Sequence, residues 1–144
     1  MKCLIQRVKK ASVHCEDELL SQIGKGYLVF LGVEEGDTEA EADKTLEKLL
    51  KLRLFPNEEG KLDFSIEEVK GELLVVSQFT LCADTKKGRR PNFTSAAAPE
   101  LAKKLYAYFI EGAKQSLSSS VQSGRFAAMM DVSLVNDGPF TISL

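Results

Sequence analysis

The chain has 144 residues, 44% of them hydrophobic, and a formal net charge of −2 at pH 7. This length and apolar content suit a single domain, residues 1–144, and exclude a disordered chain, because apolar positions recur throughout and the charges are mixed in sign. The near-neutral balance also excludes a protein that coats long stretches of nucleic acid, so any nucleic-acid contact is expected at a short segment such as one end, and no DNA partner is expected.

The first predicted elements are strands. Residues 4–8 and 12–16 predict two short strands joined at residues 9–11, and the second alternates apolar with polar side chains. A turn at residues 24–26 follows. The continuous apolar run 27–33 is then typical of a strand that is buried on both faces.

A helix is predicted next. After a turn, Thr38 and Glu41 have the spacing of a capping box, which satisfies free backbone amides at a helix start. The apolar residues that follow keep helical spacing, and these are Ala42, Leu46, Leu49 and Leu50. Residues 52–55 predict a short strand, while residues 62–66 are weakly patterned.

The second half begins with a strong strand at residues 73–76, which is expected to run on into residues 77–81. Residues 83–98 form a polar loop that is long for a compact domain, and long loops are often functional. Pro99 suits the first position of a second helix. The apolar stripe expected on that helix is Leu101, Leu105, Tyr108 and Phe109.

The last part of the chain predicts a loop and two strands. Residues 115–124 are rich in serine and predict a loop, and residues 130–135 and 140–144 predict strands on either side of residues 136–139. Two main helices with about seven strands indicate an α/β fold with a mixed, curved, barrel-like sheet.

Polar residues follow the strong strand at residues 77–81. In open α/β sheets, ligands gather beyond the carboxyl ends of strands. Gln78 offers an amide donor, Thr80 a hydroxyl, and the local backbone amides a cradle for an oxyanion. A strand here would place Gln78 and Thr80 on one face, with Ser77 and Phe79 on the other. The pattern leaves two interpretations open: a site, or a strand that becomes exposed at its end.

The densest basic run, Lys86-Lys87-Gly88-Arg89-Arg90, lies in the long loop directly after this segment. A terminal phosphate of a nucleic acid is one candidate partner for these cations. The alternative is an ordinary solvated face, which the sequence alone favours.

Residues 136–139, Asn-Asp-Gly-Pro, contain the Asp-Gly pair that is common in hairpin turns. Pro139 is unusual in that role, because it cannot donate a hydrogen bond to a sheet. A cis Gly138–Pro139 bond would turn neighbouring carbonyl oxygens to one side, where they could act as a steric gate. Arg7 shares a strand face with apolar residues, so its guanidinium either binds backbone carbonyls or reaches water from an edge strand.

Other catalytic constellations are weak. The single histidine, His14, is expected at the surface, and it points away from its neighbour Cys15 because adjacent strand residues face opposite sides. No spacing matches a known metal motif, and residues 24–26 are too short for a phosphate-binding loop. We therefore expect no metal and no cofactor.

The cysteines bear on the compartment. Cys3, Cys15 and Cys82 are an odd number and form no C-x-x-C pair, which fits reduced thiols better than disulfides or a zinc ribbon. No signal-peptide core is visible, and no apolar run approaches the roughly 20 residues needed to cross a bilayer. A cytoplasmic protein with no membrane partner is expected.

Several motifs appear together in a fixed order. They are Gln6-Arg7-Val8 with Ala11-Ser12-Val13, the SQFTL of residues 77–81, Arg90-Pro91-x-Phe93, the helix containing Leu105-Tyr106, and the NDGPFT of residues 136–141. With these motifs the chain resembles the D-aminoacyl-tRNA deacylases over essentially its whole length. SQFTL alone would be a weak signal, whereas both active-site motifs at this separation are specific. One departure is Met129, where members often carry an acidic residue, and this affects local contacts rather than the activity class.

The resemblance implies an activity and two partners. The activity is hydrolysis of the ester between a D-amino acid and the terminal adenosine of tRNA, and of glycine mischarged on tRNA. The partners are the aminoacylated 3′ end of tRNA and a second copy of the chain in a homodimer. A cis Gly138–Pro139 pair, held by Arg7, would enter the other subunit's site, where its carbonyls exclude an L-amino acid by clash.

The resemblance also implies roles for residues around the ester. Ser77, Gln78 and Thr80 would be the catalytic residues, with Phe79 binding substrate beside them. Phe126 and Met130 match positions near the terminal adenine. Thr80 is either a nucleophile or a positioning residue that leaves the chemistry to the tRNA 2′-hydroxyl and a water, and the absence of a base beside Thr80 favours positioning.

The sequence leaves two alternative functions open. A non-catalytic module that binds the tRNA end could use the same fold, since fold does not fix function. A small-molecule esterase is the other, although the G-x-S-x-G elbow of such enzymes is absent.

Overall fold

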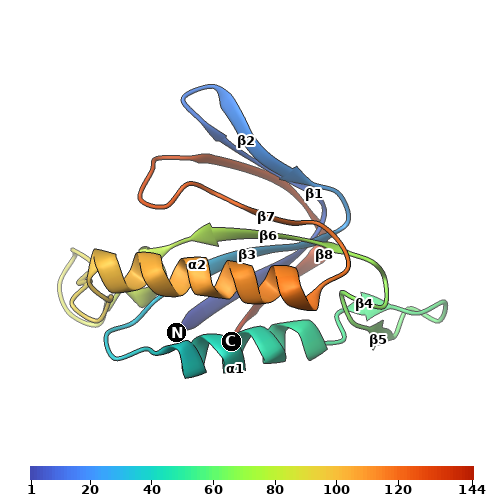
Figure 1. The fold of residues 1–144 in the computed structure, drawn as a ribbon, viewed down its shortest axis with the longest axis horizontal. Coiled ribbons are helices and arrows are strands. Elements are labelled where there is room, and N and C mark those ends of the chain that lie inside the picture. The colour runs from blue at the N-terminus through green and yellow to red at the C-terminus, as the bar shows by residue number, and fades with distance from the viewer.

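The computed structural model describes all 144 residues. They form eight strands, two α-helices and one 3-10 helix, η1. In chain order the elements are β1 (Lys2–Cys15), β2 (Glu18–Ile23), β3 (Gly26–Gly32), α1 (Glu39–Lys51), β4 (Phe55–Pro56), β5 (Leu62–Phe64), β6 (Glu72–Ser77), η1 (Phe79–Cys82), α2 (Pro99–Ser116), β7 (Val121–Ser123) and β8 (Asp131–Ser143). The predicted single-domain α/β fold is confirmed, with two helices and a nearly closed, barrel-like mixed sheet (Figure 1).

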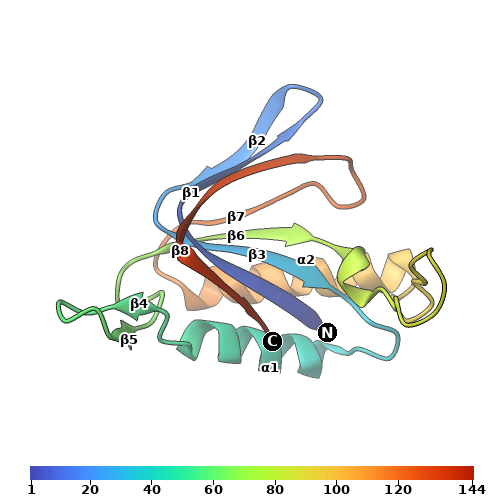
Figure 2. The ribbon, with the colours of Figure 1, turned by 180° about the vertical axis from the view of Figure 1, so that it is seen from behind.

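The sheet is organised around β1. Its strand order is β2-β1-β3-β6-β7, and β8 also pairs with β1. The first half of β1 pairs with β3 and the second half with β2, while β8 runs along β1 from Leu4 to His14. These pairings are antiparallel, whereas β3–β6 and β6–β7 are parallel. With three partners, β1 bends across the fold, as Figure 2 shows from behind.

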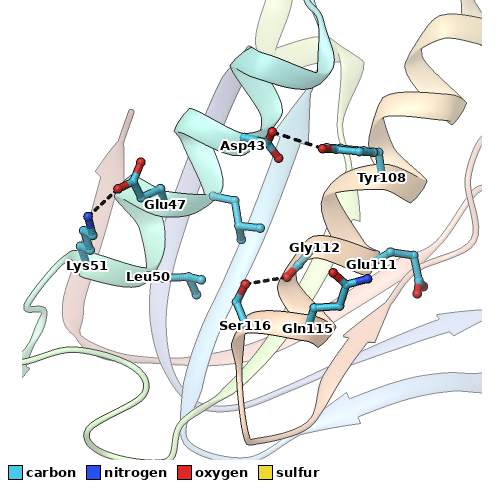
Figure 3. A pocket seen from close by; sticks show the side chains of 10 residues that line it. Asp43, Glu47, Leu50, Lys51, Tyr108, Glu111, Gly112, Gln115 and Ser116 are labelled. Atoms are coloured by element: carbon cyan, nitrogen blue, oxygen red, sulfur yellow. Dashed lines mark hydrogen bonds and ion pairs between the residues drawn. The ribbon is translucent and has the colours of Figure 1, made fainter.

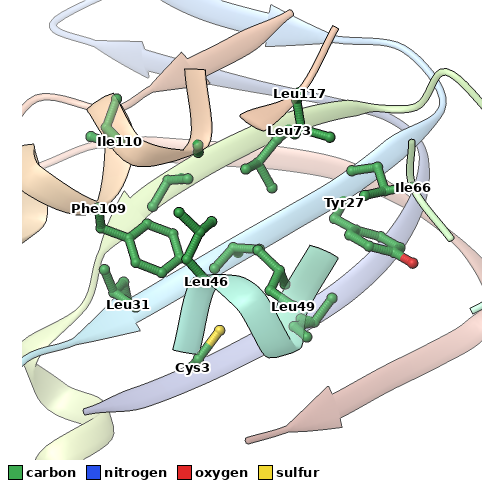
Figure 4. Close-up of a cluster of buried hydrophobic side chains, with 14 of the residues drawn as sticks. Cys3, Tyr27, Leu31, Leu46, Leu49, Ile66, Leu73, Phe109, Ile110 and Leu117 are labelled. Atoms are coloured by element: carbon green, nitrogen blue, oxygen red, sulfur yellow. The ribbon is translucent and has the colours of Figure 1, made fainter. Parts of the chain in front are cut away.

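Both faces of the central strands are buried. Tyr27, Val29 and Leu31 of β3 belong to a cluster that packs under the two helices (Figure 4). Leu28 of β3 belongs to a second cluster inside the curl of the sheet, with Val8 and other residues of β1 and β6. The prediction of a strand buried on both faces at residues 27–33 is therefore confirmed. At the start of β3 only glycine fits, since a Cβ on Gly26 would lie 1.8 Å from the Glu72 carbonyl oxygen.

Both predicted helices are present. In α1 the buried positions are Ala42, Leu46 and Leu49, and α2 starts at Pro99 as expected. The capping box is wrong in detail, because the Thr38 hydroxyl donates to the Glu41 carboxylate and makes no bond to the backbone. The buried stripe of α2 is shifted slightly from the predicted one and comprises Leu105, Tyr106, Phe109, Ile110 and Ala113.

Several predicted boundaries are wrong. The two N-terminal strands are one continuous strand, β1, because three neighbouring strands pair along it. The two C-terminal strands are likewise assigned as one, β8, with irregular pairing near its middle. The loop expected at residues 115–124 contains the end of α2 and the short strand β7. The strand through residues 77–81 ends at Ser77 and gives way to η1.

Candidate active site

The candidate site lies at the carboxyl ends of two neighbouring parallel strands. Strand β6 ends at Ser77 and β7 ends at Ser123, and the register Val75↔Ser123 aligns them. The Gly124 amide donates to the Val75 carbonyl at 3.0 Å. The Tyr106 hydroxyl of α2 donates to the Val75 carbonyl at 2.8 Å and lies 3.4 Å from the Gly124 carbonyl. Residues 77–80 and the chain after Gly124 therefore share one edge of the sheet, where open α/β folds bind ligands.

Residues 77–80 turn back at this edge. The Gln78 amide nitrogen donates to the Leu31 carbonyl at 2.8 Å, which anchors the turn to β3. The Gln78 side-chain amide then donates to the Thr80 hydroxyl at 2.6 Å. The sequence correctly placed these two side chains together, but for the wrong reason, because they meet across a 3-10 turn rather than along a strand.

No base contacts the Thr80 hydroxyl, which accepts a hydrogen bond from the Gln78 side chain. The one histidine, His14, is half-buried at the other end of β1, in register with Leu19 and Asp131. A hydroxyl needs an adjacent base to become a strong nucleophile. The geometry fits a Thr80 that orients a substrate better than a Thr80 that attacks it.

Two of the three buried thiols, Cys3 and Cys82, offer no nucleophile either. Burial raises the pKa of the Cys3 thiol to about 12. Burial also raises the pKa of Cys82, whose thiol lies 3.6 Å from the Val33 carbonyl. A thiol is reactive as the thiolate, so these two side chains are structural at neutral pH. No group of three or more His, Cys, Asp or Glu side chains gathers as a metal site.

Phe79 projects from the turn and is 56% exposed. Its ring meets that of Phe93 edge-on, with 5.1 Å between centroids. Phe93 belongs to the long loop, and the neighbouring Ser95 hydroxyl donates to the Cys82 carbonyl at 2.6 Å. The long loop is therefore docked against the candidate site.

Phe126 and Met130 lie in the chain that follows β7. The Phe126 ring is 5.8 Å from that of Tyr106, and the Met130 sulfur accepts the Arg125 amide at 3.3 Å. Both side chains are half-buried. Met129 between them is 92% exposed, so the departure from the family pattern at this position faces solvent.

Arg7 has a different environment, being only 8% exposed. Its Nε donates to the Asp137 carbonyl at 3.0 Å and lies 3.3 Å from the Asp137 carboxylate. Its Nη1 donates to the Leu54 carbonyl, and its guanidinium sits 4.7 Å above the Phe140 ring centroid. The prediction that backbone carbonyls satisfy this arginine is confirmed, and the alternative of an edge arginine in water is wrong.

Residues 136–141 are closed on themselves. The Asn136 side chain accepts the Phe140 amide and donates to the Phe140 carbonyl at 3.3 Å and the Thr141 hydroxyl at 3.2 Å. The Gly138–Pro139 bond is cis, and both residues are exposed. A Cβ on Gly138 would lie 2.5 Å from the Phe140 nitrogen, so this position requires glycine.

A single chain does not bring Gly138–Pro139 to Thr80. Val8 is in register with both Asn136 and Gly26, and Gly26 with Glu72, the first residue of β6. Ser77 is the last residue of β6. At about 3.3 Å per residue, the length of β6 separates Gly138–Pro139 from the segment that begins at Ser77 by roughly 17 Å along the strands.

A separate groove lies elsewhere on the molecule. It has a volume of about 550 Å³ and runs between α1 and α2, lined by Leu50 and Gly112 among others (Figure 3). Four of its polar side chains pair with one another, Lys51 with Glu47 and Tyr108 with Asp43. It contains none of the predicted site residues.

The chain is similar to known proteins in sequence and in fold over nearly its whole length. A family model described as D-Tyr-tRNA(Tyr) deacylase matches residues 4–144. A protein of Syntrophus aciditrophicus (strain SB) named D-aminoacyl-tRNA deacylase is 54% identical over 144 residues, covering 100% of this chain and 96% of that one. A solved structure named c-Myc DNA Unwinding Element Binding Protein has a TM-score of 0.95 and 40% identity over 100% of this chain and 97% of that one. The structure "Structural Analysis of a probable eukaryotic D-amino acid tRNA deacylase" has a TM-score of 0.85 at 18% identity, over 99% and 97% of the two chains, and it supports the fold alone.

Proposed function

The chain belongs to the D-Tyr-tRNA(Tyr) deacylase family, and on that premise we propose that it works as a homodimer whose active sites each use residues of both subunits. Its activity is that of a D-aminoacyl-tRNA deacylase, which hydrolyses the ester between a D-amino acid and tRNA. The observation that carries the proposal is the separation of the two family motifs within one chain. The ester would sit at residues 77–80, the site segment, while residues 136–141, the gate segment, would come from the partner subunit.

Exposure of the gate segment supports this arrangement. Gly138 and Pro139 are exposed, whereas Arg7, which donates a hydrogen bond to the carbonyl of the preceding Asp137, is buried. A rigid, exposed loop is suited to enter a site on another copy of the chain. Its carbonyls would clash with the side chain of an L-amino acid and leave a D-amino acid free, which is selection by exclusion. Glycine has no side chain to exclude, so glycine mischarged on tRNA would also be hydrolysed.

The proposed chemistry leaves the side chains in positioning roles. Gln78 and Thr80 orient the ester, local backbone amides bind the carbonyl oxygen as it gains negative charge, and Ser77 lines the site. A water molecule attacks the ester carbon, the bond from that carbon to the ribose oxygen breaks, and a proton from the attacking water passes to the ribose oxygen, which leaves a free ribose hydroxyl and the carboxyl group of the amino acid. Phe79, Phe126 and Met130 would bind the terminal adenosine and the amino acid.

The cytoplasm is the proposed compartment, because charged tRNA is used there. No helix of the structure has the length and apolar character of a membrane span. DNA is not a proposed partner, although one similar structure is named for DNA binding. The chain has a net charge of −2, whereas binding along DNA depends on many positive charges that neutralise phosphates. A tRNA end requires only a small number of such contacts.

Deacylation of matched D-Tyr-tRNA and L-Tyr-tRNA by the purified protein tests the reaction. Release of tyrosine from the D form, with the L form spared, is expected. A protein that binds both tRNAs but releases tyrosine from neither would instead be the non-catalytic binding module.

The Pro139→Ala variant tests the gate, with Pro56→Ala as a matched control because Pro56 is an exposed proline on the β4–β5 hairpin. We expect Pro139→Ala to lower the D-over-L ratio of rates, and Pro56→Ala to leave it unchanged. Sedimentation should give the mass of a dimer. A monomer that discriminates fully between D and L would overturn the shared site.

A further inference from the structure

The long loop carries four cations that the proposed chemistry does not use. They are Lys86, Lys87, Arg89 and Arg90, all exposed, and we call residues 84–92 the basic loop. None of the four makes an ion pair, whereas some exposed lysines on the helices do, such as Lys51 with Glu47 and Lys104 with Glu39. This cluster of unpaired positive charge stands out on a chain whose net charge is −2.

The basic loop has a defined shape. The amide of Asp84 donates to the Asn92 carbonyl at 2.8 Å, and the amide of Asn92 donates back at 2.9 Å, so the two ends are tied together. The Asp84 carboxylate accepts the Lys86 amide at 2.9 Å and is occupied with the loop's own backbone. Gly88 at the tip has φ +77, which allows the sharp turn. The four cations are thus presented together on a closed loop.

The loop stands next to the site segment. Phe93 and Ser95, which follow directly, contact Phe79 and Cys82 as described above. Figure 1 shows the loop, drawn in yellow, at the end of the molecule toward which β6 points. A substrate held at Thr80 therefore has this positive loop as its neighbour.

We propose that the basic loop binds the phosphodiester backbone of the tRNA 3′ strand where that strand leaves the ester at Thr80. The inference rests on the proposed function and adds a binding site for the part of the tRNA beyond the terminal adenosine. Phosphate oxygens are the ligands that clustered Lys and Arg side chains recognise without reading bases. The loop accordingly contributes affinity for any tRNA and no choice among amino acids.

The test uses two substrates that share the ester and differ in phosphate. One is D-Tyr-tRNA and the other is the D-tyrosyl ester of adenosine, which has no phosphate. In a variant with Lys86, Lys87, Arg89 and Arg90 changed to Gln, we expect KM for D-Tyr-tRNA to rise about 30-fold with kcat within about twofold. Turnover of the adenosine ester should stay within about twofold of that of the unaltered protein.

Salt dependence gives an independent measure. Each contact to single-stranded phosphate contributes about 0.7 to the slope of log affinity against log salt, so losing four contacts should flatten the slope by about 3. A triple variant that keeps Arg90 should flatten it by about 2. The control variant changes Lys48, Lys51, Lys61 and Lys70 to Gln, which are exposed and lie at the end of α1, on the β4–β5 hairpin and before β6, opposite the loop in Figure 1. It should change KM by less than about threefold.

Two results would overturn the proposal. An unchanged KM and salt slope for D-Tyr-tRNA would mean that the loop does not touch the backbone. An equal loss on both substrates would mean that the loop supports the fold of the site instead. Binding of uncharged tRNA, measured by fluorescence anisotropy in the same variants, reports on the loop even if the protein releases no D-tyrosine, so failure of the proposed function is separately visible.

Discussion

The site segment and the gate segment belong to the same proposed active site but are held very differently. In residues 136–141, Arg7 and Asn136 bond to the backbone on both sides of Gly138–Pro139. In residues 77–80, the only side-chain hydrogen bond joins Gln78 to Thr80, and Phe79 is more than half exposed. One segment is fixed before any ligand arrives, and the other has side chains free to bind one.

The difference fits the two tasks. Exclusion by clash fails if the excluding atoms can move aside by a fraction of an ångström, so a gate must be rigid. A segment that binds an ester gains its final contacts from the substrate. We therefore expect mutations around the gate segment to cost stability and discrimination together, and mutations in the site segment to cost rate alone.

Arg7→Ala should have the largest effect. It removes a buried guanidinium and leaves the Leu54 and Asp137 carbonyls without their donor, which should lower the free energy of unfolding by about 3–5 kcal/mol. Urea unfolding measures this loss. The control is Arg53→Ala, which removes an exposed ion pair with Asp63 and should cost less than about 1 kcal/mol. Similar costs for the two variants would contradict the special status of Arg7.

Asp37→Asn should have the next largest effect. It tests whether the chain near the site segment also has a rigid support. The Asp37 carboxylate accepts the Glu34 amide at 2.7 Å and pairs with the Met1 amino group at 2.7 Å, close to where the long loop bonds to Glu35. We expect a loss of about 2 kcal/mol near pH 7, measured by urea unfolding. If Asp37→Asn lowered the free energy of unfolding as much as Arg7→Ala does, the site segment and the gate segment would be supported equally firmly.

The same ion pair predicts a pH dependence. Burial lowers the pKa of the Met1 amino group, but hydrogen bonds to Asp37 and Glu34 and their charges outweigh this and raise it above its ordinary value. A raised pKa in the folded state means that the stabilisation is complete below the unfolded value of about 8 and is lost as pH rises through the folded pKa. Unfolding free energy should therefore fall above pH 8 in the native protein, and less steeply in Asp37→Asn. If the two proteins lost unfolding free energy equally steeply above pH 8, the Asp37 pair would not be the cause of the pH dependence.

Asn136→Ala should cost about 1 kcal/mol, because several hydrogen bonds within the gate segment are lost while water can replace some of them. We also expect a reduced D-over-L ratio, since the segment becomes mobile. Gln22→Ala is the control, an exposed amide on β2 that should change neither quantity. If the Asn136 variant keeps the full D-over-L ratio, the exclusion of L-amino acids does not depend on the rigidity of the gate segment.

Thr80→Ala should have the smallest effect on stability, within about 0.5 kcal/mol, because the side chain is exposed. If Thr80 positions the ester, kcat should fall by no more than about 100-fold. Loss of a true nucleophile would instead cost on the order of a millionfold, and single-turnover assays distinguish the two cases.

Much of the fold could be predicted from the sequence where burial imposes a regular pattern. The apolar runs at β3 and β6 arise because both faces of these strands are buried, and the helices show stripes because only one side is. Strand β2 was missed because only Ser21 and Ile23 are buried in it. Strand β7 has three half-buried residues in a serine-rich stretch, which leaves no pattern to find.

The candidate site was predicted only in part for a similar reason. Residues 77–80 and the carbonyl partners of Arg7 follow from local chemistry, since a polar strand end and a buried guanidinium each need partners. The opposite placement of the site and gate segments depends on the register of β8, β1, β3 and β6. Register across several strands is set by tertiary packing, and no short motif records it.

The pairing of β8 with β1 has a consequence for how the protein is made. Arg7 and Asp137 are separated by 130 residues, so a growing chain exposes the outer edge of β1 for most of its synthesis. An unpaired strand edge can pair with another chain, and this risk lasts for roughly 6–26 seconds at ribosomal speeds of about 5–20 residues per second. The last strand to emerge thus both closes the vulnerable edge and completes the binding pocket for the Arg7 guanidinium.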